Sequence, residues 1–191
     1  IDLDFWQEKP NDRTNFYEKY GLDKNKKSVI SVGLPIKRKG IDDFINLSKK
    51  MPEYEFAWFG KLSPAVMPAE IKKLIDNAPT NLHFPGYISS DDLREAYSGS
   101  DLYVFLTHEE TEGIVLLEAL ATKTDILIRD IEIFANDYID GQNIYKGLTN
   151  DDFERKIKAI LNEQLPSLKE EGYKKALQKS IKNTGKRLVE C

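Results

Sequence analysis

Residues 101–121 read DLYVFLTHEETEGIVLLEALA. An apolar run of strand length, 101–107, leads into a polar loop, and Gly113 opens an apolar stretch of helix length. Three glutamates crowd the loop, and a fourth, Glu118, stands inside the helix. Carboxylates are almost never fully buried unless they are paired. The stretch therefore predicts a strand, loop and helix in which Glu118 either faces solvent or has a partner.

The same alternation of strand and helix patterns runs along most of the chain. Strands are expected at 28–32, 55–59, 82–84, 101–107 and 125–129, with a sixth at 143–147, and helices at 41–51, 68–77, 90–98 and 113–122. Apolar strands joined by helices indicate a parallel sheet that is covered on both faces. We therefore predict a doubly wound, Rossmann-like α/β fold, whose ligands bind beyond the carboxyl ends of the strands.

The pattern changes at both ends of the chain. Residues 1–27 are polar and have no strand pattern, so we expect a linker and a leading helix there, before a Rossmann-like domain over 28–150. Residues 151–191 have helical patterns only, and we expect them to pack on this domain or on an absent neighbour. Because the chain begins with Ile1 rather than methionine, we also expect further sequence on its N-terminal side.

Composition restricts the class of protein. The 191 residues include 28 basic and 32 acidic side chains, so no overall positive field attracts nucleic acid. A single cysteine, Cys191, rules out an internal disulfide framework and a cysteine-built metal site. No apolar run approaches the roughly 20 residues of a membrane span, and no signal-peptide pattern opens the chain. We expect a cytoplasmic protein.

The start of the helix at Gly113 is a potential anion site. A helix N-terminus has unsatisfied N–H groups and about half a positive charge, so the amides of Gly113, Ile114 and Val115 are candidates to hold a phosphate. The neighbouring Glu109, Glu110 and Glu112 could instead only stabilise the helix dipole. Residue types alone leave both interpretations open.

A basic loop, GLPIKRKG, follows the first expected strand at 33–40. Its cations Lys37, Arg38 and Lys39 would face a diphosphate across the end of the sheet, although many basic loops are only solvated. The loop matches neither the G-x-G-x-x-G nor the Walker pattern, so a standard NAD or ATP site is disfavoured.

Together these stretches resemble a known family. Glu110 and Glu118 are separated by seven residues, as in the E-x(7)-E motif of the retaining glycosyltransferases of family 4. VGLPIKRKG (32–40) and FPGYISSDDLREAYSGSDLYVFLT (84–107) are similar to the segments that accompany this motif. The resemblance extends over 28–163 and is greatest to bacterial enzymes that attach glucose or galactose to diacylglycerol. It implies the C-terminal, donor-binding half of a GT-B glycosyltransferase, with 28–150 as the nucleotide-sugar-binding domain.

The resemblance also implies roles for individual residues. Glu118 would bind the ribose hydroxyls, Glu110 would contact the donor sugar, and Lys39 would neutralise the diphosphate, which makes Glu110 and Lys39 the expected catalytic residues. The other donor-binding residues that it implies are Gly33, Arg38, Tyr87, Ile88, Thr111, Glu112, Gly113, Ile114 and Val115. Tyr87 and Ile88 correspond to positions that line a uracil pocket. The family's arginine after the first glycine is replaced by Leu34, and we expect Arg38 to compensate.

The reaction implied is transfer of a hexose from UDP-hexose with retention at the anomeric carbon, without a cofactor or a bound metal. The expected acceptor is a membrane diacylglycerol lipid, bound by an absent N-terminal domain, so the fragment alone would bind donor without turnover. Alternatives are a polysaccharide or other non-lipid acceptor, and a non-catalytic nucleotide-sugar-binding module. A phosphoacceptor signalling domain would need an acidic pair after the first strand, where Gly33 stands instead.

The C-terminal segment raises the question of a membrane contact. Between Gly172 and Cys191 lie six basic residues, namely Lys174, Lys175, Lys179, Lys182, Lys186 and Arg187. A basic amphipathic helix can lie on anionic lipid, which would place the protein on the cytoplasmic face of the membrane. The alternative is that an apolar stripe of Tyr173, Leu177, Ile181 and Leu188 packs on the protein itself while the lysines stay solvated.

Overall fold

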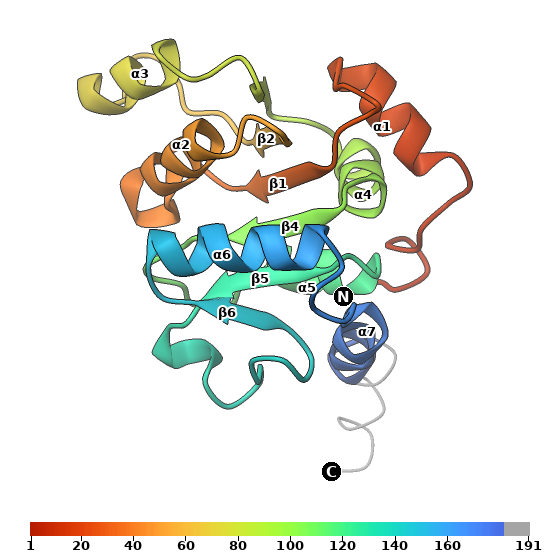
Figure 1. The fold of residues 1–191 in the computed structure, drawn as a ribbon. Coiled ribbons are helices and arrows are strands. Elements are labelled where there is room, and N and C mark those ends of the chain that lie inside the picture. The colour runs from red at the N-terminus through yellow and green to blue at the C-terminus, as the bar shows by residue number, and fades with distance from the viewer. Residues whose placement is uncertain (182–191) are drawn as a thin grey trace.

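The computed structural model describes residues 1–181, and its centre is one parallel sheet of six strands (Figure 1). The strands are β1 (Ser28–Val32), β2 (Glu55–Phe59), β3 (Leu82–Gly86), β4 (Leu102–Phe105), β5 (Ile126–Arg129) and β6 (Tyr145–Gly147). Their order in the sheet is β3-β2-β1-β4-β5-β6, and every neighbouring pair is parallel. The predicted doubly wound fold is confirmed, including its sixth strand.

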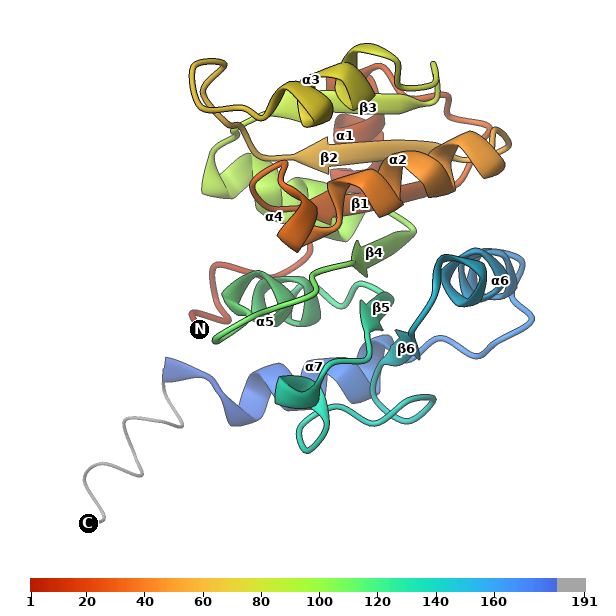
Figure 2. The ribbon, with the colours of Figure 1, turned by 90° about the vertical axis from the view of Figure 1, so that its left-hand side faces the viewer.

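Helices cover both faces of this sheet (Figures 1 and 2). One face carries α2 (Ile41–Lys50), α3 (Ala69–Asp76) and α6 (Asn150–Leu161), and the other carries α1 (Asp12–Tyr20), α4 (Ser90–Gly99), α5 (Ile114–Ala121) and α7 (Lys169–Gln178). Two short 3-10 turns, η1 (Lys37–Lys39) and η2 (Glu132–Phe134), follow β1 and β5. The molecule therefore has three layers, with an apolar cluster on each side of the sheet.

Strand β2 shows why the strands are mostly apolar. All five of its residues are buried, and successive side chains point to opposite faces of the sheet. Phe56 and Trp58 belong to the cluster under α2, whereas Ala57 and Phe59 belong to the cluster on the α1 side. Since both faces are covered, apolar side chains fill both sets of alternating positions, and the one charged residue, Glu55, stands at the first position of the strand.

The strand order reverses at the centre of the sheet. β1 pairs with β2 on one side and with β4 on the other, so the chain leaves the carboxyl ends of β1 and β4 next to each other. This is the topological switch point at which doubly wound sheets bind ligands. The loop over 33–40 and the loop over 106–113 start at this point.

The N-terminal segment is fixed to the sheet domain by a buried ion pair. Arg94 of α4 donates to both carboxylate oxygens of Asp12 in α1, at 2.6 and 3.0 Å. The hydroxyl of Ser98 donates to the same carboxylate at 2.6 Å. Burial raises the pKa of Asp12, but the hydrogen bonds from Arg94 and Ser98 outweigh burial and hold that pKa below its usual value. The leading helix α1 therefore packs on α4.

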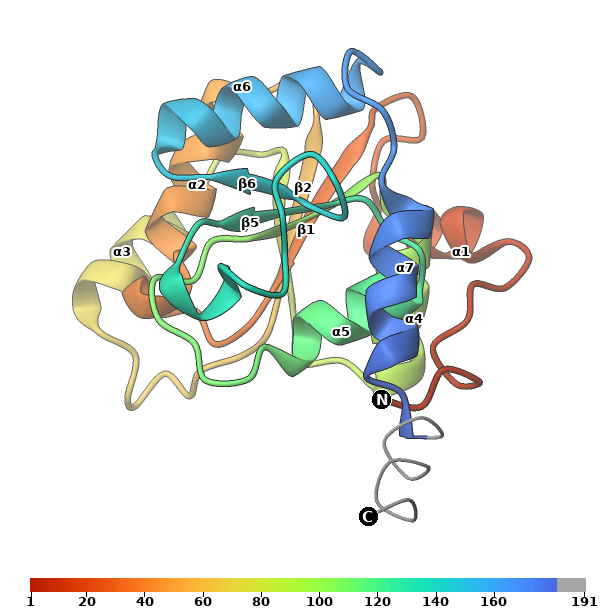
Figure 3. The ribbon, with the colours of Figure 1, turned by 90° about the horizontal axis from the view of Figure 1, so that it is seen from below.

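The last helix packs differently from the expected stripe. α7 lies on α5 (Figure 3), and its buried residues are Gly172 and Ala176. Leu177 and Ile181, two members of the expected stripe, are exposed. The helices lie so close together that a Cβ atom added at Gly172 would be 2.8 Å from a methyl carbon of Leu120, so small residues rather than large ones make the contact. Leu188, Lys182, Lys186 and Arg187 lie outside the described residues.

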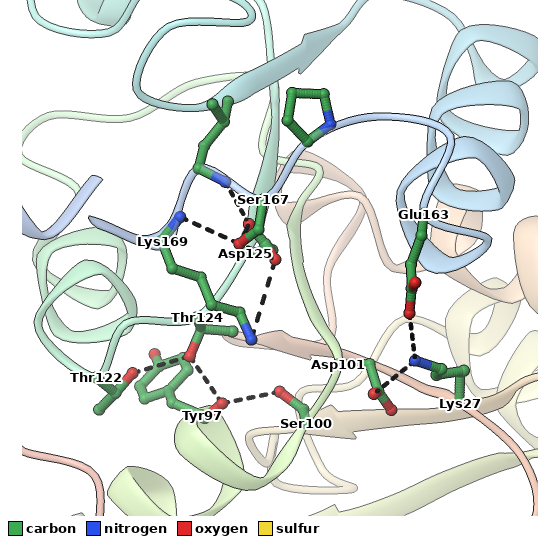
Figure 4. Close-up of polar contacts among 12 residues, drawn as sticks. Lys27, Tyr97, Ser100, Asp101, Thr122, Thr124, Asp125, Glu163, Ser167 and Lys169 are labelled. Carbon is green, nitrogen blue, oxygen red and sulfur yellow. Dashed lines mark hydrogen bonds and ion pairs between the residues drawn. The ribbon is translucent and has the colours of Figure 1, made fainter. Parts of the chain in front are cut away.

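A second group of polar contacts ties the segment before α7 to the amino ends of the strands (Figure 4). Asp125 accepts hydrogen bonds from the Ser167 hydroxyl at 2.9 and 3.0 Å. Lys27 lies between Asp101 and Glu163, at 3.7 and 3.9 Å. These residues line a cavity of about 410 Å³, but it lies at the opposite end of the sheet from the switch point. Because its charged side chains pair with one another, we assign these contacts to stability.

The buried ion pair of α1 and α4 predicts a large loss of stability in one variant. Asp12→Ala leaves the guanidinium of Arg94 buried without its carboxylate, so the free energy of unfolding should fall by about 3 kcal/mol. Urea denaturation measures this. Glu18→Ala removes a carboxylate of the same helix whose partner, Lys24, is exposed, and should cost less than about 0.5 kcal/mol. Equal losses in both variants would contradict the assignment.

Candidate functional site

A cavity of about 230 Å³ lies at the switch point of the sheet. Its walls come from the end of β1, the loop after it, the end of β4 and the first residues of α5. They consist of Val32, Gly33, Lys39, Phe105, Glu110, Thr111, Glu112, Gly113, Ile114 and Val115. Both predicted catalytic residues and most of the predicted donor-binding residues therefore meet at one place.

A second cavity, of about 220 Å³, adjoins the first and shares Val32 and Gly33 with it. Its other walls are Leu34, Phe59, Gly60, Lys61, Tyr87, Ile88 and Leu93. The walls are almost entirely apolar, and the ring of Tyr87 is 84% exposed at the rim. Such a surface suits a flat aromatic group, and it contains Tyr87 and Ile88, the residues expected at a uracil pocket.

An ion pair joins the two loops inside the first cavity. The ammonium of Lys39 lies 2.6 Å from Oε2 of Glu110, and their side chains are 17% and 11% exposed. Oε1 of Glu110 accepts a hydrogen bond from the amide of Thr111 at 3.0 Å. Burial raises the pKa of Glu110, but the hydrogen bond from Lys39 outweighs burial and lowers that pKa below its usual value. Glu110 is therefore ionised at neutral pH, and Lys39 is held in position.

The start of α5 presents backbone amides to the same cavity. The first helical hydrogen bonds run from Leu116 and Leu117 to the carbonyl of Gly113, so the amides of Ile114 and Val115 precede them. The Thr111 amide, also predicted as a donor-binding group, is already bonded to Glu110. Gly113 has φ of +67°, and a Cβ atom there would lie 3.3 Å from the Phe134 ring. Glycine is thus required by the turn into the helix.

Further hydrogen bonds fix the two loops relative to each other. The carbonyl of Arg38 accepts from the amide of His108 at 2.9 Å and from the hydroxyl of Thr107 at 3.3 Å. The imidazole of His108 lies 3.2 Å from Asp43, which agrees with a structural role for this histidine. The side chain of Arg38 is exposed and lines neither cavity.

Glu118 is not exposed, and one of its carboxylate oxygens lacks a hydrogen-bond partner among the described residues. Its side chain lies on α5 near the buried hydroxyls of Tyr97 and Tyr103, and it lines neither cavity. Burial raises its pKa to about 7, and the nearby Tyr97 hydroxyl offsets only part of this rise. Within residues 1–181 its Oε2 atom is buried without a hydrogen-bond partner. Glu118 follows Val115, a wall residue of the first cavity, by one turn of α5. A buried carboxylate with an unused acceptor is costly unless a ligand satisfies it.

One supporting residue was not foreseen from the sequence. Arg129, at the end of β5, donates to the Leu106 carbonyl at 3.0 Å, to the Leu148 carbonyl at 2.9 Å and to Asp43 at 2.6 Å. Asp43 is also the partner of His108. Arg129 thereby ties the loop after β4 to β6 and α2. Its only sequence signal is a charge that closes the apolar run ILIR.

Comparison with known proteins identifies the family. Residues 12–185 match the sequence profile of the family described as "Glycosyl transferases group 1". The chain belongs to this family. The resemblance that the two loops and the paired glutamates indicated is therefore confirmed for a group 1 glycosyltransferase domain.

Two curated relatives are glycolipid enzymes. The chain is 39% identical over 191 residues to "Processive diacylglycerol alpha-glucosyltransferase" of Acholeplasma laidlawii, covering all of this chain and 58% of that protein. It is 36% identical over 117 residues to "Alpha-galactosylglucosyldiacylglycerol synthase" of Streptococcus pneumoniae, covering 60% of this chain and 31% of that protein. The group 1 domain thus spans only part of the length of either relative.

Solved structures share the fold. The Anabaena protein HepE, in complex with UDP and glucose, superposes with a TM-score of 0.87 at 14% identity, over all of this chain and 54% of that chain. The C-terminal domain of the group 1 protein LpcC from Francisella tularensis superposes with a TM-score of 0.75 at 21% identity, over 94% of this chain and 97% of that domain. The structural neighbours are GT-B glycosyltransferases, which confirms the predicted fold class.

The environment of Glu118 predicts how its replacement changes stability with pH. In the unfolded chain its carboxyl has a pKa near 4.5, whereas burial raises the folded pKa to about 7. As pH rises between these values, the unfolded state releases the proton first, so the folded state loses relative stability. Glu118→Gln, which stays neutral, should therefore stabilise the domain by about 3 kcal/mol at pH 8 and very little at pH 4.

Urea denaturation of wild type and Glu118→Gln at both pH values measures this effect. Glu109→Gln, at an exposed position two residues after Thr107, should show no such dependence on pH. If the stability difference between wild type and Glu118→Gln were the same at both pH values, the fold would not raise the pKa of this carboxyl.

Proposed function

We propose that this domain binds UDP-hexose, and that the whole protein transfers the hexose, with retention, to a diacylglycerol-based membrane lipid. The observation that carries the proposal is the pair of joined cavities, in which an apolar pocket adjoins Lys39, Glu110 and the free amides of α5. A nucleoside diphosphate sugar has the same sequence of parts, namely a flat base, a diphosphate and a polar sugar. The names of the two glycolipid relatives support a hexose donor and a lipid acceptor.

Each part of the donor has a counterpart in the site. The base would lie in the apolar cavity near Tyr87 and Ile88, and Glu118 would accept hydrogen bonds from the ribose hydroxyls. The diphosphate would lie between Lys39 and the amides of Ile114 and Val115, with Glu110 beside the sugar. Negative charge develops on the diphosphate as the sugar leaves, so groups that are already aimed at it lower the barrier. In this proposal the cation and the amides do the neutralising, and neither a metal nor another cofactor is required.

We propose that the acceptor binds to a part of the protein outside this domain. The domain by itself is then expected to bind donor without transferring sugar, and assay of the full-length protein separates an enzyme from a non-catalytic binding module. Within residues 1–181, no helix is long and apolar enough to cross a membrane. We propose a cytoplasmic location, at the membrane face where a lipid acceptor would be reached. Comparing diacylglycerol with polysaccharide acceptors would test the acceptor class.

Calorimetry of the domain with UDP, ADP and GDP tests donor recognition. UDP is expected to bind more tightly than ADP or GDP, since the apolar cavity is small and a purine is larger than uracil. Titrations with UDP-glucose and UDP-galactose then test the sugar. Glu118→Ala should abolish measurable UDP binding while circular dichroism shows an unchanged fold, and Glu109→Ala should bind as wild type does. If none of the nucleotides bound at millimolar concentration, the proposed function would be wrong.

A further inference from the structure

The side chains of the donor cavity supply little positive charge for a diphosphate. Lys39 is the single cation on its walls, and it is already paired with Glu110 at 2.6 Å. Glu112 adds a second carboxylate to the same walls. These described wall residues thus have more negative than positive charge, whereas a diphosphate needs cationic or strongly polar donors. Backbone amides supply some of these donors, and a second cation near the cavity would supply the positive charge that Lys39 alone does not.

Three basic side chains near the switch point are candidates for this second cation. Lys37 is held 2.8 Å from Glu70 of α3, and it lines neither of the two joined cavities. Arg38 also lines neither cavity. Lys61 lines the apolar cavity, is exposed, and makes no ion pair in the part of the chain that the structure describes. Of the three, Lys61 alone is both on the wall and uncommitted.

The backbone places Lys61 beside Gly33, which both cavities share. The amide of Gly33 donates to the carbonyl of Phe59 at 2.9 Å, which continues the pairing of β1 with β2 beyond the strand ends. Gly60 approaches so closely that a Cβ atom there would be 2.0 Å from the Gly33 carbonyl oxygen. Lys61 is the next residue, so it starts from the backbone that touches Gly33, the residue shared by both cavities.

Lys61 also faces Leu34 across one cavity. Leu34 and Lys61 line the same cavity, one from the loop after β1 and the other from the loop after β2. Among the described residues that line this cavity, Lys61 is the only charged one. A wall that is otherwise apolar gives its ammonium no partner within residues 1–181. Its long, flexible stem leaves the ammonium free to turn toward a ligand at Gly33.

We propose that Lys61 is a second diphosphate-binding residue of this domain, supplying a cation from the loop after β2. The inference rests on the proposed function, since it assigns one more contact to the same nucleotide. The ligand chemistry is the diphosphate of a nucleoside diphosphate or its sugar ester. Lys39 and Lys61 then approach this group from two different loops.

Calorimetry with UDP and uridine tests the contact. Lys61→Gln should weaken UDP binding roughly tenfold, because a charge-assisted contact is lost, while uridine, which has no phosphate, should bind as before. The dependence of UDP affinity on salt concentration should also become smaller. Lys37→Gln is the matched control, as its lysine comes from the same edge of the sheet and is tied to Glu70, and it should leave both affinities unchanged.

A rescue experiment tests whether positions 34 and 61 serve the same phosphate. Introducing Leu34→Arg into Lys61→Gln should restore UDP affinity to within a few-fold of wild type. Unchanged UDP affinity in Lys61→Gln would overturn the inference while the proposed function stands. An equal loss of uridine and UDP affinity would also overturn it, because Lys61 would then contact the nucleoside. If wild type did not bind UDP at all, the proposed function itself would fail.

Discussion

The site depends on the reversal of strand order at the centre of the sheet. Because β1 has β2 on one side and β4 on the other, two loops that are far apart in sequence leave the sheet side by side. Hydrogen bonds from Thr107 and His108 to the Arg38 carbonyl then hold these loops together. The ion pair of Lys39 with Glu110 and the amides of α5 are positioned by this one feature of the topology, and the apolar cavity adjoins them through Val32 and Gly33.

The site also contains groups that the fold alone would not favour. Glu118 has a buried oxygen without a partner, and the hydroxyls of Tyr97 and Tyr103 near it are likewise buried and unsatisfied in the described chain. Each such group costs free energy, and apolar side chains at these positions would make a more stable core. A stability cost on the helix that also supplies walls of a cavity is typical of a binding site, where activity and stability compete. The strain at Glu118 therefore supports its assignment as a ligand contact.

The sequence predicted the sheet and the main loops because these depend on local patterns. Apolar runs such as EFAWF mark buried parallel strands, and the apolar run after Gly113 placed Glu110 in the loop before a helix and Glu118 inside that helix. Contacts between distant segments were not predictable in this way. The role of Arg129 gave no sequence signal beyond its charge. The predicted packing of α7 was wrong because Gly172 and Ala176, rather than the larger Leu177, make the close contact. Local periodicity identifies large apolar residues, whereas helices that approach closely need small ones.

The two lysines proposed at the diphosphate would contribute in different ways. Lys39 is fixed by Glu110 before any ligand arrives, so little side-chain entropy is lost when a phosphate approaches it, but part of its charge is already compensated. Lys61 is exposed and unpaired in the described chain, so its full charge is available, and ordering it costs up to about 2 kcal/mol. Lys39 is therefore suited to hold the geometry that the reaction requires. Lys61 can follow the diphosphate as its charge increases when the sugar leaves.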